Sequence, residues 1–357
     1  ILLDVDVVAL NNAGKSTSSN FDNAVATKKV YKNGRTYTYV SGQAWRYWWR
    51  EALQKNFGWQ LSPVTRDNKI AFTAADPIKF PDDDMFGYMK AAKDVVVDEQ
   101  GKPVLDKKGK EQKEDVTVTR VSPLKNSVIV SVSSTTTAEN WSSMARQDGD
   151  SVPYSKEEYS AIMKGMFSID LAQVGTFASY NKTGFKNLTE KMREDALKGS
   201  STEIDDPFNK DSKGVPQKLI RLSKEIRLKR VTDTIQALKV ISGGAMQTNN
   251  MTDVTPKFIV LASTTSGNHP FSHIATSEGS RNEKAYLSID AITEVLKDYK
   301  DQFSGTVFIG LRTGFMDDMK EKLKSLENAG SDYAKVQVGT VNEAIENYCK
   351  TIKEVLA

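Results

Sequence analysis

Apolar and polar positions alternate in some parts of the chain and recur at helical spacing in others. Residues 1–11 alternate and are rich in Val and Leu, which predicts a strand. Ser41 is placed to cap a helix over residues 41–57, and a second long helix is predicted over residues 217–241. Further strands are predicted over residues 116–134, around residues 161–171, and over residues 257–263 and 308–312, with helices near residues 315–328 and 341–356.

The order of the first six elements is strand, helix, strand, strand, helix, strand. This is the split βαβ, or ferredoxin-like, pattern of an α+β protein. It is also the topology of the RRM, in which the face of an antiparallel sheet and its edge loops contact single-stranded RNA. We therefore expect a modified RRM or ferredoxin-like palm (βαββαβ). It is interrupted by a charged insertion over residues 59–115 and by a polar, linker-like loop over residues 198–216.

The composition is that of an ordinary globular protein, with 357 residues for one large domain or two modest ones. Cys349 is the only cysteine, which excludes a disulfide within the chain and favours a reducing cytoplasm. No apolar run approaches the length of a membrane span, and no stretch has the pattern of a signal peptide. The net charge of +3 is too small to identify a nucleic-acid partner, so the distribution of basic residues matters more.

The stretch around Gly14-Lys15 looks at first like a nucleotide-binding loop at the end of a strand. A P-loop needs an earlier glycine at the position that Ala9 occupies here. It also needs a helix whose N-terminus faces the phosphates, and the residues that follow have no helical apolar stripe. We therefore interpret the stretch as a polar loop that leaves the first strand.

Several segments, taken in order along the chain, resemble one family. They are ALNNAG, NAVATKKVYKNGRTYTYVSGQAWRYWWREAL, DMFGYM, SPLKNS and ISGGAMQ. Together they resemble the repeated backbone subunit of type I CRISPR interference complexes (Cascade), in the DevR autoregulator subgroup of the RAMP superfamily that is found with type I-B systems. The resemblance covers nearly the whole chain and depends on the co-linear set rather than on one motif.

The resemblance implies an RRM-like palm with finger and thumb insertions. The palm then comprises residues 1–58, 116–197 and 217–264, with a finger-like insertion over residues 59–115, a flexible loop and candidate thumb over residues 198–216, and a helical C-terminal extension over residues 265–357. The basic segment after the flexible loop is the other candidate for the thumb.

The resemblance also implies a function in antiviral defence. Copies stack head to tail along a CRISPR guide RNA and hold its spacer for pairing with target DNA. Such contacts do not close into a ring, so they give a helical filament that other subunits end. The implied partners are the guide RNA, the target DNA through the guide, further copies of the chain, a capping subunit, a large and a small subunit, and the guide-processing endonuclease. Cleavage would belong to a separate helicase-nuclease, so we expect no enzyme activity, catalytic residue, cofactor, metal or membrane partner here.

Candidate RNA-binding residues follow from matching the family's motifs to this sequence. The resemblance places the Asn11-Asn12 turn, followed by Lys15, next to the guide backbone. The other candidates are Lys28, Lys29 and Arg35 before the first helix, Ser41, Gln43, Arg46 and Arg50 at its start, Met85 and Phe86 in the finger region, Arg230 in the second basic segment, and the Gly243-Gly244 loop.

A helix N-terminus that follows basic residues suits phosphate for a physical reason. Its first N–H groups have no partner within the helix and carry partial positive charge. Ser41 and Gln43 add hydrogen-bond donors, and Arg46 and Arg50 share a face and add full charges. Such contacts hold a backbone without reading its sequence, as a guide of any spacer requires. The alternative is a surface helix with solvated arginines.

The Trp cluster of the same helix is expected to be mostly core, with at most one or two rings stacking on bases.

Two further signals have two interpretations each. Residues 218–230 carry six basic residues against one acid, and form either a positive wall along the guide or target strand or a solvated helix face. Gly243-Gly244 either permits close approach of the backbone to RNA or only ends a helix.

Asp82, Asp83 and Asp84 are the candidate for metal-dependent catalysis, since hard cations bind clustered carboxylates. Related backbone subunits of type III complexes cut target RNA with an acidic residue in a loop, but a Pro-Asp-Asp-Asp turn is more often a helix cap. His269 and His273 are too few for a zinc site, and no Ser-His-Asp constellation can be argued. The rival functions are thus a type III-like ribonuclease and, from the subgroup's name, a transcriptional autoregulator that binds nucleic acid, although no helix-turn-helix is evident.

Overall fold

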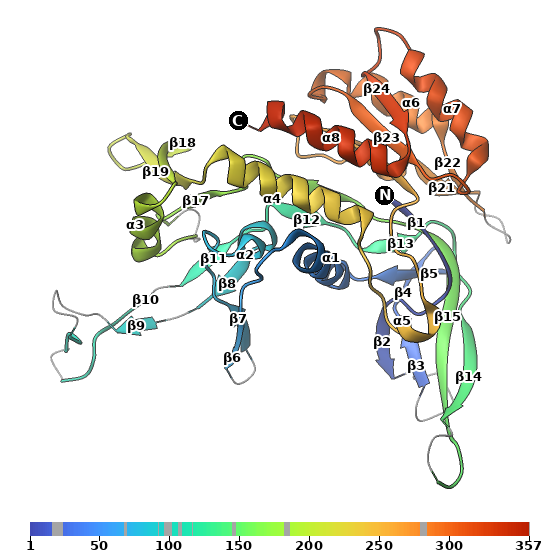
Figure 1. Ribbon diagram of the computed structural model, residues 1–357, viewed down its shortest axis with the longest axis horizontal. Helices are drawn as coiled ribbons and strands as arrows, with labels where there is room; N and C mark the ends of the chain where they lie inside the picture. Colours follow the sequence, from blue (N-terminus) through green and yellow to red (C-terminus); the bar gives the residue numbers. More distant parts are fainter. Residues whose placement is uncertain are drawn as a thin grey trace. The chain divides into compact units, whose positions relative to one another are not determined.

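The structure is a computed structural model that forms two compact units (Figure 1). It describes residues 1–15, 24–67, 70–91, 93–95, 102–105, 109–115, 117–144, 148–181, 186–278 and 284–356. Unit 1 comprises Ile1–Phe57, Asn126–Ser168 and Thr234–Val355. Unit 2 comprises Gly58–Lys125, Ile169–Asp233 and the C-terminal Leu356. The chain is thus a mixed α+β protein, as predicted.

Unit 1 is built on one large sheet whose central strands are β1 (Leu2–Val8) and β15 (Val152–Lys164). They pair antiparallel, with Leu2 opposite Lys164. The sheet follows the order β24-β23-β20-β1-β15-β13-β5-β4. The other strands on this path are β4 (Lys29–Lys32), β5 (Arg35–Val40), β13 (Ile129–Ser131), β20 (Phe258–Leu261), β23 (Val307–Leu311) and β24 (Val336–Gly339). The strands predicted over residues 1–11, 116–134, 257–263 and 308–312 are therefore confirmed.

The first half of β15 continues past the end of β1 and forms a long hairpin with β14 (Ala138–Met144), which Figure 1 shows extending from the sheet. The same half pairs in parallel with β3 (Ala24–Thr27), and β3 pairs with β2 (Asn12–Lys15). The strand predicted around residues 161–171 is therefore displaced. The chain leaves β15 at Lys164, and only the short β16 (Phe167–Ile169) follows, paired with β12 (Leu124–Asn126).

Helix α1 (Gly42–Phe57) forms where it was predicted, and its aromatic side chains explain why it packs. Trp45, Trp48 and Trp49 are all buried, and the rings of Trp45 and Trp49 stack with centroids 5.3 Å apart. The indole of Trp49 donates a hydrogen bond of 2.7 Å to the carbonyl of Thr234. All three Trp residues predicted to be mostly core are thus in the core, and the exposed aromatic residue of the helix is Tyr47.

The C-terminal part of unit 1 extends the sheet through β23, at the strand predicted over residues 308–312, and through β24, which was not predicted. β23 pairs antiparallel with β20, and β24 pairs in parallel with β23. Every residue of β23 is buried, because helices cover both of its faces. The helices here are α6 (Ile289–Asp298), α7 (Lys320–Ser325) and α8 (Val341–Val355), with the short strands β21 (Ala275–Ser277) and β22 (Ala285–Leu287).

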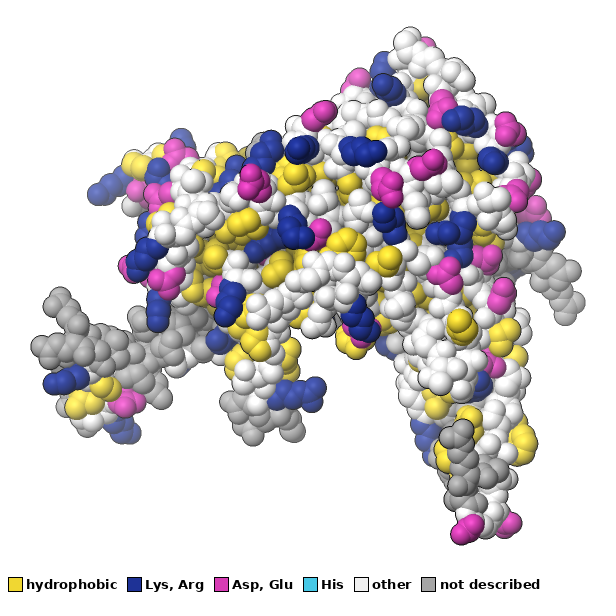
Figure 2. Space-filling model, in the orientation of Figure 1, with side chains coloured by type: hydrophobic (Ala, Val, Ile, Leu, Met, Phe, Trp, Pro, Cys, Tyr) yellow, Lys and Arg dark blue, Asp and Glu magenta, His cyan; other side chains and the backbone are white. Residues whose placement is uncertain are grey.

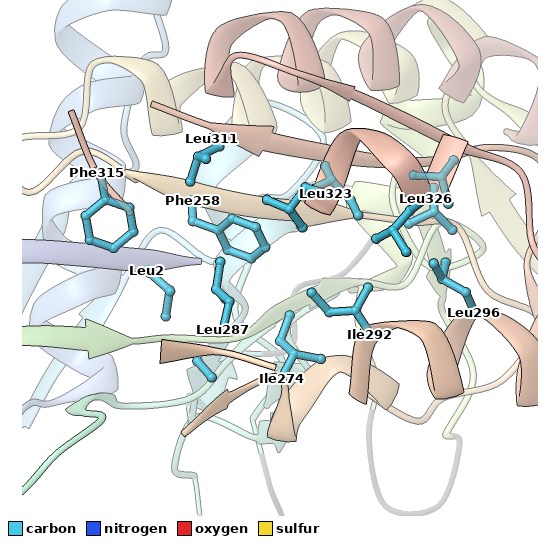
Figure 3. Packing of buried hydrophobic residues seen from close by; sticks show 14 of the residues in the cluster. Leu2, Phe258, Ile274, Leu287, Ile292, Leu296, Leu311, Phe315, Leu323 and Leu326 are labelled. Carbon is cyan, nitrogen blue, oxygen red and sulfur yellow. The ribbon is translucent and has the colours of Figure 1, made fainter. Parts of the chain in front are cut away.

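Side chains on alternate positions of β23 enter different layers of this core. Figure 3 shows Leu311 and Phe258 beside Ile292 of α6 and Leu323 of α7, in one hydrophobic cluster. On the opposite face, the ring of Phe308 packs edge-on against Tyr348 of α8, with centroids 6.0 Å apart. An added Cβ at Gly310 would lie 2.7 Å from the Cα of Val341, so glycine is needed there for α8 to approach the strand.

Unit 2 contains short hairpins and a three-stranded sheet in the order β17-β19-β18. The strands are β6 (Val64–Asp67), β7 (Ile70–Thr73), β8 (Tyr88–Lys90), β9 (Lys93–Val95), β10 (Lys113–Asp115), β11 (Val118–Arg120), β17 (Thr176–Ala178), β18 (Thr202–Lys210) and β19 (Pro216–Arg221). The helices are α2 (Pro81–Phe86), α3 (Glu190–Lys198) and α4 (Lys224–Gln236), and the chain passes into unit 1 in the last turn of α4.

Two sequence predictions fail in this unit. The polar segment over residues 198–216 is not a flexible loop, because β18 pairs with β19 as a hairpin. Its buried residue, Asp206, accepts hydrogen bonds from the hydroxyl of Tyr180 and from the backbone N–H of Phe208. The helix predicted over residues 217–241 begins only at Lys224, since the preceding residues form β19.

Buried charges in unit 2 are concentrated around α2. The buried ionic side chains of this group are Asp82, Asp83, Asp84, Arg120, Arg227 and Arg230. Asp84 is fully buried and pairs with two arginines. Its Oδ2 lies 2.6 Å from Nη1 of Arg230 and accepts a hydrogen bond of 2.9 Å from the backbone N–H of Gly175, while its Oδ1 accepts one from Arg120. The guanidinium of Arg120 stacks over the ring of Phe177 at 4.4 Å.

Removing the Asp84 charge should therefore destabilise unit 2 strongly. Asp84→Asn leaves two buried guanidinium groups without their shared counter-charge, which typically costs about 3–5 kcal/mol. We expect a clearly lower midpoint in chemical denaturation of the full chain. The matched control is Asp195→Asn in α3, where the ion pair with Lys198 is exposed and an effect below about 1 kcal/mol is expected. Equal midpoints for the two variants would contradict this account.

Candidate nucleic-acid interface

The interface begins where β1 ends in a β-bulge. Val5 pairs with Ala161 but Val8 pairs with Tyr159, so β1 holds one extra residue in this interval. Val7 adopts a positive φ of 50°, and its backbone N–H donates to the hydroxyl of Ser160 at 3.0 Å. The bulge redirects the chain before it reaches Asn11.

Asn11 connects the end of β1 to the start of α1. Its Oδ1 accepts a hydrogen bond of 2.8 Å from the backbone N–H of Ser41, and its carbonyl accepts one of 3.0 Å from the N–H of Lys28. The hydroxyl of Ser41 in turn accepts from the N–H of Ala44 at 3.3 Å, which is the predicted helix cap. Gln43 is exposed on the first turn. The Asn11 side chain therefore holds the N-terminus of the helix beside the exit of the strand.

The glycine loop, residues 243–252 after α4, begins next to the end of β1. The backbone N–H of Ala245 donates to the carbonyl of Leu10 at 3.0 Å. Gly244 has a φ of 108°, and a Cβ there would lie 2.7 Å from the side chain of Leu10. A Cβ on Gly243 would overlap the indole ring of Trp48. Both glycines are thus required by contacts within the protein, which leaves their predicted approach to RNA as a prediction.

The two arginines of α1 are half-buried and lie in a polar setting. Nη1 of Arg46 donates to Oδ1 of Asn126 at 2.9 Å, and the amide of Asn126 donates to the carbonyl of Gly42 at 3.2 Å. Burial, and then the like charge of Arg50, lower the pKa of Arg46 to about 10, so Arg46 stays charged at neutral pH. Two cations held close together favour a polyanion that neutralises them.

The basic residues before α1 occupy strands β2 to β5. Lys29 is largely committed to the protein, because its Nζ lies 2.5 Å from a carboxylate oxygen of Glu157. Asn12 and Lys15 are exposed on β2, and Lys28 and Arg35 are half-buried. Lys29 is thus held in a structural ion pair, whereas Asn12 and Lys15 are exposed to solvent.

Three predicted RNA-binding residues are buried in unit 2, which corrects their assignment. Met85 has no exposed surface, and Phe86 is 8% exposed. Arg230 is paired with Asp84 and donates to the carbonyl of Pro77 at 2.9 Å. Side chains with so little exposed surface offer almost nothing to a ligand, so these residues contribute mainly to the fold. The basic type of Arg230 gave no indication of burial, since a buried arginine needs a partner that local sequence does not show.

The acidic cluster does not form a metal site. The carboxylate of Asp82 accepts from the N–H of Ser62 and that of Asp83 from the N–H of Asp76, each at 2.9 Å, while Asp84 binds its arginines. The three side chains therefore diverge toward different segments. Across the described part of the chain, no group of three or more His, Cys, Asp or Glu side chains is placed to hold a metal ion, and His269 and His273 do not form one.

Sequence reasoning missed several residues that hold this interface in place. Asn126 contacts both Gly42 and Arg46, and its motif SPLKNS contributed to the resemblance without a role. Glu157 lies beside the basic strands and Glu158 beside the glycine loop. Nothing in their local sequence distinguishes these two residues of β15 from solvated acids.

Within the described residues, no helix is both long and apolar enough to cross a membrane.

Comparison with known proteins agrees with the resemblance seen in the sequence. Residues 3–284 match the model of the family described as "CRISPR-associated negative auto-regulator DevR/Csa2". No curated protein sequence matches the chain. Among solved structures, a chain of a "CRISPR RNA-guided surveillance complex, pre-nicking" is similar in fold, with a TM-score of 0.50 and 10% identity over 100% of this chain and 98% of that one. A chain of another "CRISPR RNA-guided surveillance complex" has a TM-score of 0.43 and 9% identity over 99% and 100%. Because the family model spans most of its 357 residues, the chain belongs to the CRISPR-associated DevR/Csa2 family.

Proposed function

We propose that this chain is the repeated, guide-RNA-binding backbone subunit of a type I CRISPR surveillance complex and that it is not itself an enzyme. Membership of the DevR/Csa2 family carries the proposal. The similar fold of a chain from an RNA-guided surveillance complex supports it. The partners are the guide RNA, target DNA paired with that guide, further copies of the chain and the other subunits of the complex, in the reducing cytoplasm that the lone Cys349 favours.

The central strands of unit 1 support an RRM-like palm. β20, β1, β15 and β13 are neighbours in this order, and each adjacent pair is antiparallel. β1 is therefore parallel to β13, with α1 between them in the chain and β15 between them in the sheet. β15 is likewise parallel to β20, with α4 in the connection. Two interlocked split βαβ units of this kind make the ferredoxin-like and RRM topology.

The geometry of the interface suits the backbone of a guide. Three segments far apart in sequence, at Asn11, Ser41 and Ala245, are joined by hydrogen bonds at one edge of the palm. Arg46 and Arg50 add charge next to the N-terminus of α1. Helix N–H groups and cations that bind phosphates do so without reading base edges, so such a guide can carry any spacer and its bases stay available for pairing. Insertions from one copy would lap onto the next in a filament that does not close.

The description of the family as a negative auto-regulator keeps a second function in view. A regulator would bind its own promoter as duplex DNA without a guide. The test is to purify the protein with its neighbouring gene products and to sequence the nucleic acid that they hold. Short transcripts with spacer sequences support the backbone subunit, whereas specific duplex binding by protein free of RNA would support the regulator.

Replacing both arginines of α1 should weaken guide retention without regard to sequence. For Arg46→Ala with Arg50→Ala we expect a similar loss for every spacer, because the contacts are to phosphates. The slope of log affinity against log salt should fall by about 0.7 for each lost phosphate contact. The control is Lys55→Ala, which removes a cation from the same helix where it pairs with Glu51 at 3.0 Å. A loss that depends on spacer sequence would contradict backbone contacts.

Assembled complexes should not cut matched RNA in the presence of magnesium. The only clustered aspartates considered for catalysis, Asp82, Asp83 and Asp84, are buried and hydrogen-bonded to the protein. Incubation of wild-type complex with matched RNA and Mg²⁺ is expected to leave the RNA intact. Cleavage that disappears in Asp82→Ala or Asp83→Ala, in protein that stays folded, would favour the ribonuclease instead.

A further inference from the structure

The glycine loop continues into a tight turn with unusual backbone geometry. α5 (Gln247–Asn250) is a single turn of helix flanked by Met246 and Met251, which adopt positive φ values of 59° and 45°. Residues other than glycine occupy this region only when the surroundings hold them there. Met251 is 90% exposed, so its side chain does not supply that hold. Other contacts must maintain the turn.

Gln247 holds the turn from within. Its amide nitrogen donates to the carbonyl of Gly243, and its amide oxygen accepts from the backbone N–H of Thr252 at 2.9 Å. The side chain thus bridges the two ends of the loop. It fixes the shape of the turn but not its position on the protein.

A polar cluster around the buried Glu158 of the β14–β15 hairpin fixes that position. The amide of Asn250 donates to Oε1 of Glu158 at 3.1 Å, and Nζ of Lys156 lies 2.7 Å from the same oxygen. The other oxygen of Glu158 accepts from the amide of Asn140 at 2.7 Å. Burial raises the pKa of Glu158, but the hydrogen bonds from Lys156, Asn140 and Asn250 outweigh it and hold the pKa below the usual range. The carboxylate is therefore ionised and fully engaged at neutral pH.

The neighbouring carboxylate of the same strand holds a different segment. Glu157 accepts hydrogen bonds from the backbone N–H of Thr27 at 2.8 Å and from Nζ of Lys29 at 2.5 Å. Successive residues of a strand point to opposite faces, so Glu157 and Glu158 project in opposite directions. Adjacent positions of β15 thus anchor the basic strands on one face and the glycine loop on the other.

We propose that Glu158 is a positioning residue that fixes the glycine loop for guide binding. It does so by accepting a hydrogen bond from Asn250 of the loop, while Lys156 neutralises its charge. The inference rests on the proposed function, because it takes the loop to face the guide. Glu158 does not itself contact RNA. It sets where Gly243 and the following turn lie relative to the end of β1, and RNA contacts that depend on a fixed backbone weaken when this anchor is lost.

Amide hydrogen exchange of the full chain without RNA tests the anchor directly. In Glu158→Gln, the shape of the side chain is kept but its charge is lost, and exchange over residues 243–252 should become about tenfold faster or more, as expected for the loss of hydrogen bonds to a charged group. Asn250→Ala removes the other partner at a half-buried position, so that it tests the anchor even if Glu158→Gln folds poorly. The matched control is Glu157→Gln, which should accelerate exchange over residues 24–32 and leave residues 243–252 unchanged.

Guide retention by the assembled complex supplies the second measurement. Glu158→Gln and Asn250→Ala should both release the guide at lower salt than wild type. Unchanged exchange over residues 243–252 in both variants would overturn the anchor. Faster exchange with guide retention equal to wild type would overturn its positioning role. If wild-type complexes carried no guide, the proposed function would fail, whereas the exchange measurement would still decide whether Glu158 anchors the loop.

Discussion

The antiparallel pairing of β1 with β15 is the constraint on which the rest of unit 1 depends. β15 has thirteen residues and β1 has seven, so the first half of β15 extends beyond β1. This half pairs with β14 and β3 instead. The bulge at Val7 sets where β1 turns away and delivers Asn11 to the start of α1. A slip of one residue in this register would exchange the faces of Glu157 and Glu158, and both anchored segments would lose their partners.

Burial and pairing decide which basic residues remain available to a polyanion. Arg230 lies in a highly basic segment, yet its charge is neutralised by Asp84 inside unit 2. Lys29 is close to the candidate interface, but Glu157 neutralises it. A neutral partner, Asn126, orients the guanidinium of Arg46. A count of basic residues in the sequence therefore overstates the positive field, and the orientation of the remaining groups matters more.

Elements with a strong period were predictable, whereas elements defined by distant partners were not. The alternation of residues 1–11 and the helical stripes of residues 41–57 and 341–356 correctly indicated β1, α1 and α8. β18 is mostly exposed and polar, and it forms a strand because β19 pairs with it. Met85 and Phe86 were assigned to RNA because the resemblance places their segment in the finger region, which says nothing of how deeply that segment is buried. The junction of Asn11 with Ser41 and of Leu10 with Ala245 joins residues that local pattern cannot relate.

The two glycines of the loop over residues 243–252 are explained by packing within the protein. Two glycines suggested a backbone free to approach RNA, but each one is needed first because another part of the protein occupies the space of a side chain. Trp48, a core residue of α1, lies against Gly243, and Leu10 at the end of β1 lies against Gly244. The distance between the loop, the helix N-terminus and the strand exit is therefore set by core packing, which tolerates little change. An interface that must hold any spacer needs the same geometry for every sequence. Core packing fixes the shape of this interface, so that shape does not depend on the sequence bound.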